Sequence, residues 1–129
     1  ESALRHGLDE PLDVMTRLHA LGVQLAIDDF GTGYSSLARL GHLPVDQVKI
    51  DQSFVAAIDR PGDRLGRIVD AVIAIAAALD HRTTAEGVET DTQLDYLRRM
   101  HCDYAQGYLF SRPVPFDEFA ALVASDPRW

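Results

Sequence analysis

The chain alternates between stretches with a helical spacing of apolar residues and short stretches that are almost continuously apolar. In residues 11–22 leucine and methionine recur at every third position, as on one face of a helix, and Gly22 is placed to end that helix. Residues 23–28 form an apolar run with the length of a buried strand. The pattern predicts helices over residues 11–22, 35–43, 68–79, 90–100 and 115–123, and strands over residues 23–28, 46–51, 82–87 and 104–110.

Strands that alternate with helices are typical of parallel βα units, so the predicted fold class is α/β. Thr90 and Gln93 have the spacing of a capping box, which marks residue 90 as the start of a helix. Residues 59–63 read as a turn-rich loop. No linker or low-complexity segment interrupts the alternation, which favours one continuous structural unit.

The composition is that of a soluble globular domain, with 129 residues, 47% hydrophobic and 25% charged. The most apolar run, residues 68–79, is interrupted by Asp70 and is too short to span a bilayer. A single cysteine, Cys102, rules out an internal disulfide and favours a reducing, cytoplasmic location. The sequence begins at Glu1 and not at methionine, so we expect it to be a piece of a longer protein.

The formal net charge of −8 argues against DNA or RNA as a partner. Proteins that bind a nucleic-acid backbone place lysine and arginine along a surface stripe, whereas the basic residues here are scattered. An anionic ligand would therefore need another source of positive charge. A divalent metal ion in an acidic pocket would supply it.

Polar residues follow or interrupt each of the predicted strands. Because parallel strands end at a common rim, where α/β folds build their sites, these side chains are expected to lie close together. They are Asp28 and Asp29 at the end of the first strand, Lys49 within the second, Glu86 at the end of the third with Glu89 just beyond, and Gln106 at the end of the fourth.

The adjacent carboxylates of Asp28 and Asp29 are costly to bury unless they hold a cation, serve a reaction or cap a helix. Neighbouring residues of a strand point to opposite faces, so both can reach one site only if the strand ends there. Gly31 and Gly33 would allow that sharp exit. Taken alone, the pair leaves the capping of a following helix open as an alternative.

Four motifs carry a resemblance to a known family: DDFGTGYSSL, VKIDQSF, AEGVET and YAQGYLFSRP. In this order and at these spacings they resemble the EAL-domain family, the cyclic di-GMP phosphodiesterases of bacterial signalling. The resemblance runs from the opening ESAL to about Val123. It implies a TIM-like (β/α)8 barrel that hydrolyses one phosphodiester bond of cyclic di-GMP, giving linear pGpG, with two Mg or Mn ions.

The resemblance covers only part of such a barrel, which needs roughly 250 residues. The Glu-Ala-Leu segment and a downstream metal-binding asparagine are missing, and a further metal-binding glutamate would lie just before Glu1. We therefore expect residues 1–129 to be the C-terminal part of a single EAL domain, about half of the barrel, and to be inactive alone. Exposed strand edges make a homodimer possible. The parent protein is expected to carry regulatory or GGDEF-type domains and could be membrane-anchored.

The resemblance also implies roles for the metal-binding residues. Asp28 would bridge two metal ions, which a shared carboxylate holds about 3.5–4 Å apart, and Asp29 would bind the second ion. Glu86 would be a ligand or base at that second metal and help to prepare the attacking water.

The remaining candidates would support this centre. Lys49 would orient the water or stabilise charge on the phosphoryl oxygens, although a structural ion pair is an open alternative. Glu89 and Gln106 would support the ligands or the substrate, and Gln106 could equally be a hydrogen-bonding residue of the interior. Glu1 resembles the family glutamate that steadies the loop after the aspartate pair.

Two other readings compete with this one. The DFG within the first motif also occurs in protein kinases, but the other kinase motifs are missing, which excludes that class. A non-catalytic EAL domain, acting as a cyclic di-GMP receptor or a protein-interaction module, is the main alternative. The joint presence of Asp28, Asp29, Lys49 and Glu86 favours the enzyme, because binding alone does not need all four.

Overall fold

The computed structural model describes residues 9–32, 40–60, 62–125 and 127. Glu1, Gly33 and most of the helix expected over residues 35–43 lie outside the described residues. None of the helices in the described ranges is both long enough and apolar enough to cross a membrane.

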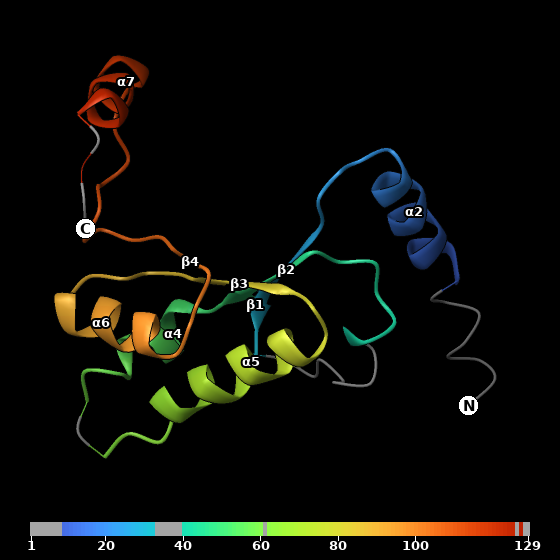
Figure 1. Ribbon diagram of the computed structural model, residues 1–129, viewed down its shortest axis with the longest axis horizontal. Coiled ribbons are helices and arrows are strands. Elements are labelled where there is room, and N and C mark those ends of the chain that lie inside the picture. The colour runs from blue at the N-terminus through green and yellow to red at the C-terminus, as the bar shows by residue number, and fades with distance from the viewer. Residues whose placement is uncertain (1–8, 33–39, 61, 126, 128–129) are drawn as a thin grey trace.

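The centre of the molecule is a parallel sheet of four strands in the order β1-β2-β3-β4, flanked by helices (Figure 1). This arrangement confirms the predicted α/β class. Each predicted strand is present, although its bounds differ by a few residues. The strands are β1 (Ala26–Phe30), β2 (Gln47–Ile50), β3 (Arg82–Ala85) and β4 (Tyr104–Ala105).

The helices over residues 11–22, 68–79, 90–100 and 115–123 are confirmed to within a few residues at each end. The capping box is present as predicted, with Thr90 accepting from the Gln93 amide and the Gln93 side chain accepting from the Thr90 amide. The described helices are α2 (Asp9–Ala20), α4 (Gln52–Ala56), α5 (Gly66–Ala78), α6 (Asp91–Arg99) and α7 (Phe116–Ala124).

The short helix α4 was not predicted from the sequence. It has only five residues, too few for a helical periodicity to show. The local signal is Asp51, whose carboxylate accepts from the Ser53 amide and caps the first turn. Asp51, directly after β2, is therefore the one residue in the sequence that signals the start of α4.

Two strand predictions need correction. The first strand does not end at the aspartate pair, because Phe30 still pairs with Ile50 of β2. The fourth strand covers two residues and not the whole of residues 104–110. Beyond it the backbone folds back, with the Phe110 amide donating to the Gly107 carbonyl at 3.1 Å. Gly107 and the residues after it form a turn and leave the sheet.

The core lies between the sheet and α5, which runs along one side of it in Figure 1. Val48 and Ile50 of β2 and Val69 of α5 are fully buried. Burial of side chains of this size stabilises the fold by about 1.5–3 kcal/mol each, so the contact between β2 and α5 anchors the sheet. In contrast, α7 has no buried residue and stands apart from the sheet at the other end of the molecule from α2 (Figure 1).

The turn after β4 packs directly on the segment after β3. The Leu109 amide donates to the Val88 carbonyl at 2.9 Å, and the Val88 amide donates to the Gln106 carbonyl at 3.0 Å. A Cβ atom on Gly107 would come within 2.1 Å of the Val88 carbonyl oxygen, so only glycine fits there.

We predict that Gly107→Ala destabilises the folded protein by about 2–3 kcal/mol or more, because the two segments must move apart. Gly41→Ala is the control, since the nearest atom to its added Cβ is a flexible leucine methyl 3.6 Å away. The control should change stability by less than about 1 kcal/mol. Urea unfolding measures both, and equal effects would contradict the packing described for Gly107.

Candidate metal centre

A bulge in β1 brings two adjacent aspartates to one side of the sheet. Ile27 pairs with Val48 and Phe30 pairs with Ile50, so Asp28 and Asp29 together lie opposite the single residue Lys49. A two-against-one pairing of this kind breaks the strict alternation of side chains along a strand. Both aspartates were expected to reach one site because the strand ends at them. The bulge brings them to one site although the strand continues to Phe30.

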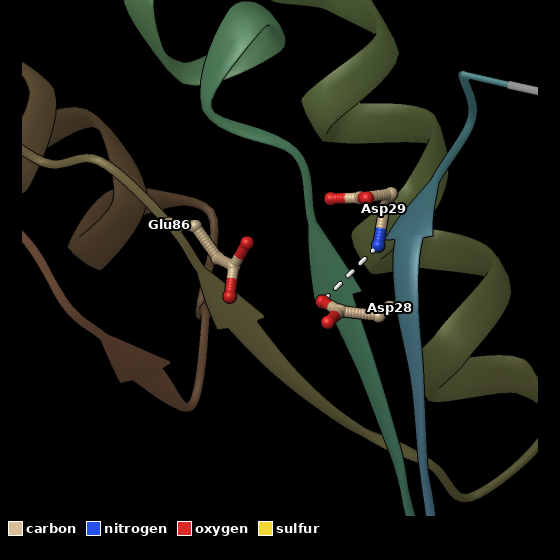
Figure 2. Close-up of side chains that lie close together, drawn as sticks. All are labelled: Asp28, Asp29 and Glu86. Carbon is tan, nitrogen blue, oxygen red and sulfur yellow. Dashed lines mark hydrogen bonds between the residues drawn. The ribbon is translucent and has the colours of Figure 1, made fainter.

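The backbone of Asp29 makes this arrangement possible. Its φ is 49°, in the left-handed region that aspartate adopts more readily than most residues. The Asp29 amide donates to Asp28 Oδ1 at 3.2 Å. Figure 2 shows both carboxylates extending from β1 toward Glu86. Gly31 then turns the chain away at φ 101°, as predicted, and a Cβ there would lie 2.7 Å from the Phe54 ring.

Lys49 links the first strand to the third. Its Nζ lies 2.8 Å from Asp28 Oδ1 and also contacts Glu86 Oε1, so one ammonium group pairs with two carboxylates. Glu86 directly follows β3, and its side chain is 16% exposed against 65% for Asp28. The Gln106 amide group, just after β4, donates to Glu86 Oε1 at 2.9 Å. All four strands therefore contribute to one cluster.

These contacts shift the protonation equilibria of the central pair. The hydrogen bond from Lys49 lowers the pKa of Asp28 below its ordinary value of 3.8, despite some desolvation. The hydrogen bonds to Asp28 and Glu86 raise the pKa of Lys49 above 10.5. Both groups are therefore charged over the whole neutral range.

The donor set fits a divalent cation. Oxygen atoms of Asp28, Asp29 and Glu86 lie within 4.8 Å of one another, which is close enough to contact the same ion. Carboxylate oxygens are hard ligands of the type that Mg²⁺, Mn²⁺ and Ca²⁺ prefer. Among the residues that the structure describes, this is the one such group of three.

The predicted site residues fall into two groups. Asp28, Asp29, Lys49, Glu86 and Gln106 come together as one cluster. Glu89 lies outside the carboxylate group: it is exposed and lines the adjoining cleft, and its amide donates to the Gln93 side chain at 2.8 Å. No position is described for Glu1.

The cluster opens onto a cleft of about 790 Å³. Asp29, Glu86 and Glu89 line one part of it, and residues of the turn after β4 and of α7 line another. The lining includes charged and aromatic residues that were not among the candidates from the sequence, such as Asp51, Tyr108 and Arg112. Asp51 directly follows β2, so the rule of polar residues at strand ends would have found it.

The model of the EAL domain family matches residues 1–113. The chain belongs to the EAL domain family. The cyclic di-GMP phosphodiesterase NbdA of Pseudomonas aeruginosa is 51% identical over 115 residues, which are 89% of this chain and 15% of NbdA.

Solved EAL structures share the fold of this chain and part of its sequence. The EAL domain of Mycobacterium smegmatis DcpA is 48% identical, with a TM-score of 0.82 over 92% of this chain and 53% of that one. The PaMucR phosphodiesterase in complex with c-di-GMP is 41% identical, with a TM-score of 0.81 over 87% of this chain and 45% of that one. The chain thus spans about half of these EAL structures, and they confirm the TIM-barrel-like fold class.

A third structure bears on metal binding. BlrP1 of Klebsiella pneumoniae, solved as a manganese and cy-diGMP complex, is 38% identical with a TM-score of 0.73, covering 82% of this chain and 27% of that one. A divalent ion together with the cyclic dinucleotide in an EAL protein agrees with the carboxylate cluster seen here, and supports dependence on a divalent metal.

We predict that Lys49→Met destabilises the metal-free protein near neutral pH, because Asp28 and Glu86 lose their shared counter-charge. The lost stabilisation is fully present above the ordinary pKa of Asp28 and disappears as the pH falls through its lowered value. It is also present below the ordinary pKa of Lys49 and disappears as the pH rises through its raised value.

Urea unfolding of wild type and variant should therefore show a difference in the free energy of unfolding that is constant around neutral pH. This difference should shrink toward both acidic and alkaline extremes. Arg17→Met is the matched control, because Arg17 is 78% exposed and its contact with Asp13 is 3.9 Å long. Such exposed pairs contribute at most about 1 kcal/mol. If Lys49→Met lowers the free energy of unfolding at pH 7 no more than Arg17→Met does, the ion pair of Lys49 with both carboxylates is contradicted.

Proposed function

We propose that this chain supplies the second-metal half of the active site of a cyclic di-GMP phosphodiesterase. The observation that carries the proposal is the carboxylate cluster of Asp28, Asp29 and Glu86, with Lys49 between two of its members, in a chain of the EAL domain family. The reaction is hydrolysis of one phosphodiester bond of cyclic di-GMP, which gives linear pGpG.

The chain acts in this proposal as the C-terminal part of one EAL domain. The rest of that domain supplies the Glu-Ala-Leu segment and the other ligands of the first metal, so residues 1–129 alone do not turn over substrate. Coverage of about half of the solved EAL structures supports this division. The name of MucR, a bifunctional diguanylate cyclase/cyclic di-GMP phosphodiesterase, supports a parent protein that also carries a GGDEF-type domain.

Asp28, Asp29 and Glu86 would hold the metal ions, with Asp28 shared between two of them. When bound, two Mg or Mn ions neutralise the phosphodiester and lower the pKa of a bound water. The side chains must be fixed before substrate arrives. The bulge in β1 fixes both aspartates, and Lys49 holds Asp28 Oδ1 in place at 2.8 Å.

Glu86 is the base in this scheme. Lys49 and Gln106 both contact its Oε1, which leaves the lone pairs of Oε2 for a metal ion or for the proton of the attacking water. Gln106 thereby orients the carboxylate, in the way that hydrogen-bonding partners orient the ligands of other metal sites. Lys49 remains protonated throughout and stabilises the negative charge that collects around the phosphoryl oxygens.

The test is turnover of cyclic di-GMP by a complete EAL domain that ends with this chain. Asp28→Asn should lower kcat by at least about a thousandfold at saturating Mn²⁺, because both ions lose a charged ligand. Lys49→Ala should lower kcat by about 10- to 100-fold, with a smaller change in metal affinity.

Asp13→Asn is the matched control for charge, because Asp13 is an exposed carboxylate on α2, away from the cleft. It should retain wild-type turnover. Turnover by Asp28→Asn at the wild-type rate would refute the assignment of the shared ligand. Tight binding of cyclic di-GMP without turnover, by the wild-type domain with Mn²⁺, would instead favour the receptor.

A further inference from the structure

The cleft beside the metal centre is acidic, with one cation among the lining residues that the structure describes. Asp29, Asp51, Glu86 and Glu89 all line it, whereas among its described lining residues Arg112 alone carries a positive charge. In the described parts of the chain Arg112 forms no ion pair with a carboxylate. A cation left in this position among acids is therefore available to a ligand.

Arg112 lies over an aromatic ring. Its guanidinium carbon lies 4.5 Å from the centroid of the Tyr108 ring, which also lines the cleft and is 52% exposed. Arginine stacks on an aromatic ring through the face of its guanidinium group, which leaves the N–H donors in the plane available to a ligand. Tyr108 thus restrains the guanidinium group of Arg112 and leaves its N–H groups free to donate hydrogen bonds to a ligand.

The backbone around the stack is firmly placed. The turn after β4 is tied to Val88 through the Leu109 amide, and the Ser111 amide donates to the Gly107 carbonyl at 3.4 Å. The same turn carries Gln106, which contacts Glu86 of the metal cluster. The position of Arg112 and Tyr108 is therefore coupled to the position of the reacting centre by a few residues of fixed chain.

We infer that the Tyr108–Arg112 stack recognises a guanine base of the substrate and selects guanine over adenine. The inference rests on the proposed function and specifies how its substrate is chosen. A planar fork of donors matches the two acceptors O6 and N7 of guanine. Adenine presents N7 beside an amino donor, and a donor that faces the donors of Arg112 leaves both unpaired.

The stack also suits a base more than a phosphate alone. An isolated arginine on an exposed loop loses much side-chain freedom when it binds, but one already stacked on a ring loses less. The planar edge of a base requires that fixed orientation, whereas a phosphate accepts hydrogen bonds from many directions. Neutralisation of a phosphate is the competing role, and it predicts no difference between the two bases.

The experiment compares cyclic di-GMP with cyclic di-AMP as substrates of a complete EAL domain that ends with this chain. Arg112→Met should raise KM for cyclic di-GMP by about tenfold or more, with kcat changed much less, and should narrow the preference over cyclic di-AMP by a similar factor. Arg112→Lys should fail to restore that preference, because an ammonium group has neither the plane nor the fork.

Arg99→Met is the matched control. Arg99 also stacks on a tyrosine, Tyr96, at 5.9 Å, but it lies on α6 outside the lining of the cleft. This variant should leave KM and the base preference at wild-type values. An equal loss for both cyclic dinucleotides in Arg112→Met, or no loss for either, would overturn the inference.

Failure of the proposed function gives a different result. If the wild-type domain shows no turnover, equilibrium dialysis with Ca²⁺ measures binding of the two cyclic dinucleotides. A guanine preference in binding that Arg112→Met narrows would sustain the inference while the hydrolase proposal falls. If the wild-type domain binds neither dinucleotide, or binds both equally, the inference is overturned.

Discussion

The pairing of one ammonium group with two carboxylates is the interaction on which the site depends. Lys49 stands in β2, between the fully buried Val48 and Ile50, and its Nζ contacts Asp28 and Glu86. Carboxylates this close repel one another, and that repulsion would spread the cluster in the absence of a counter-charge. Lys49 therefore keeps the ligands assembled before a metal ion arrives, and β2 anchors it.

The common direction of the parallel strands is the second constraint on the site. Parallel strands bring residues from distant parts of the chain to one rim, and Glu86 and Gln106 reach the cluster because β3 and β4 end there. Asp29 departs from regular strand geometry with φ 49°, and that departure aims its carboxylate at the site. Backbone strain at a residue of this kind is typical of functional positions.

Much of this could be predicted from the sequence, because the pattern of hydrophobic and polar residues gives the order of helices and strands along the chain and the polar residues at the strand ends. The position of Lys49 within β2 and the contacts of Gln106 agree with that prediction. The bulge could not be predicted, since the pairing register depends on tertiary contacts that a local pattern does not record. Nor could the stack of Arg112 on Tyr108, because both residues look like ordinary surface residues until the turn after β4 places them in the cleft.

In the proposed site, the β1 bulge makes Asp28 and Asp29 ligands of adjacent metal ions. Anomalous diffraction at the manganese edge, from crystals of a complete EAL domain that ends with this chain, tests it most directly. We predict two manganese peaks about 4 Å apart, with the Asp28 carboxylate in contact with both and Asp29 in contact with one. Two results would show that these residues are not the metal ligands. One is manganese that contacts neither Asp28 nor Asp29, and the other is the absence of any manganese peak beside Glu86.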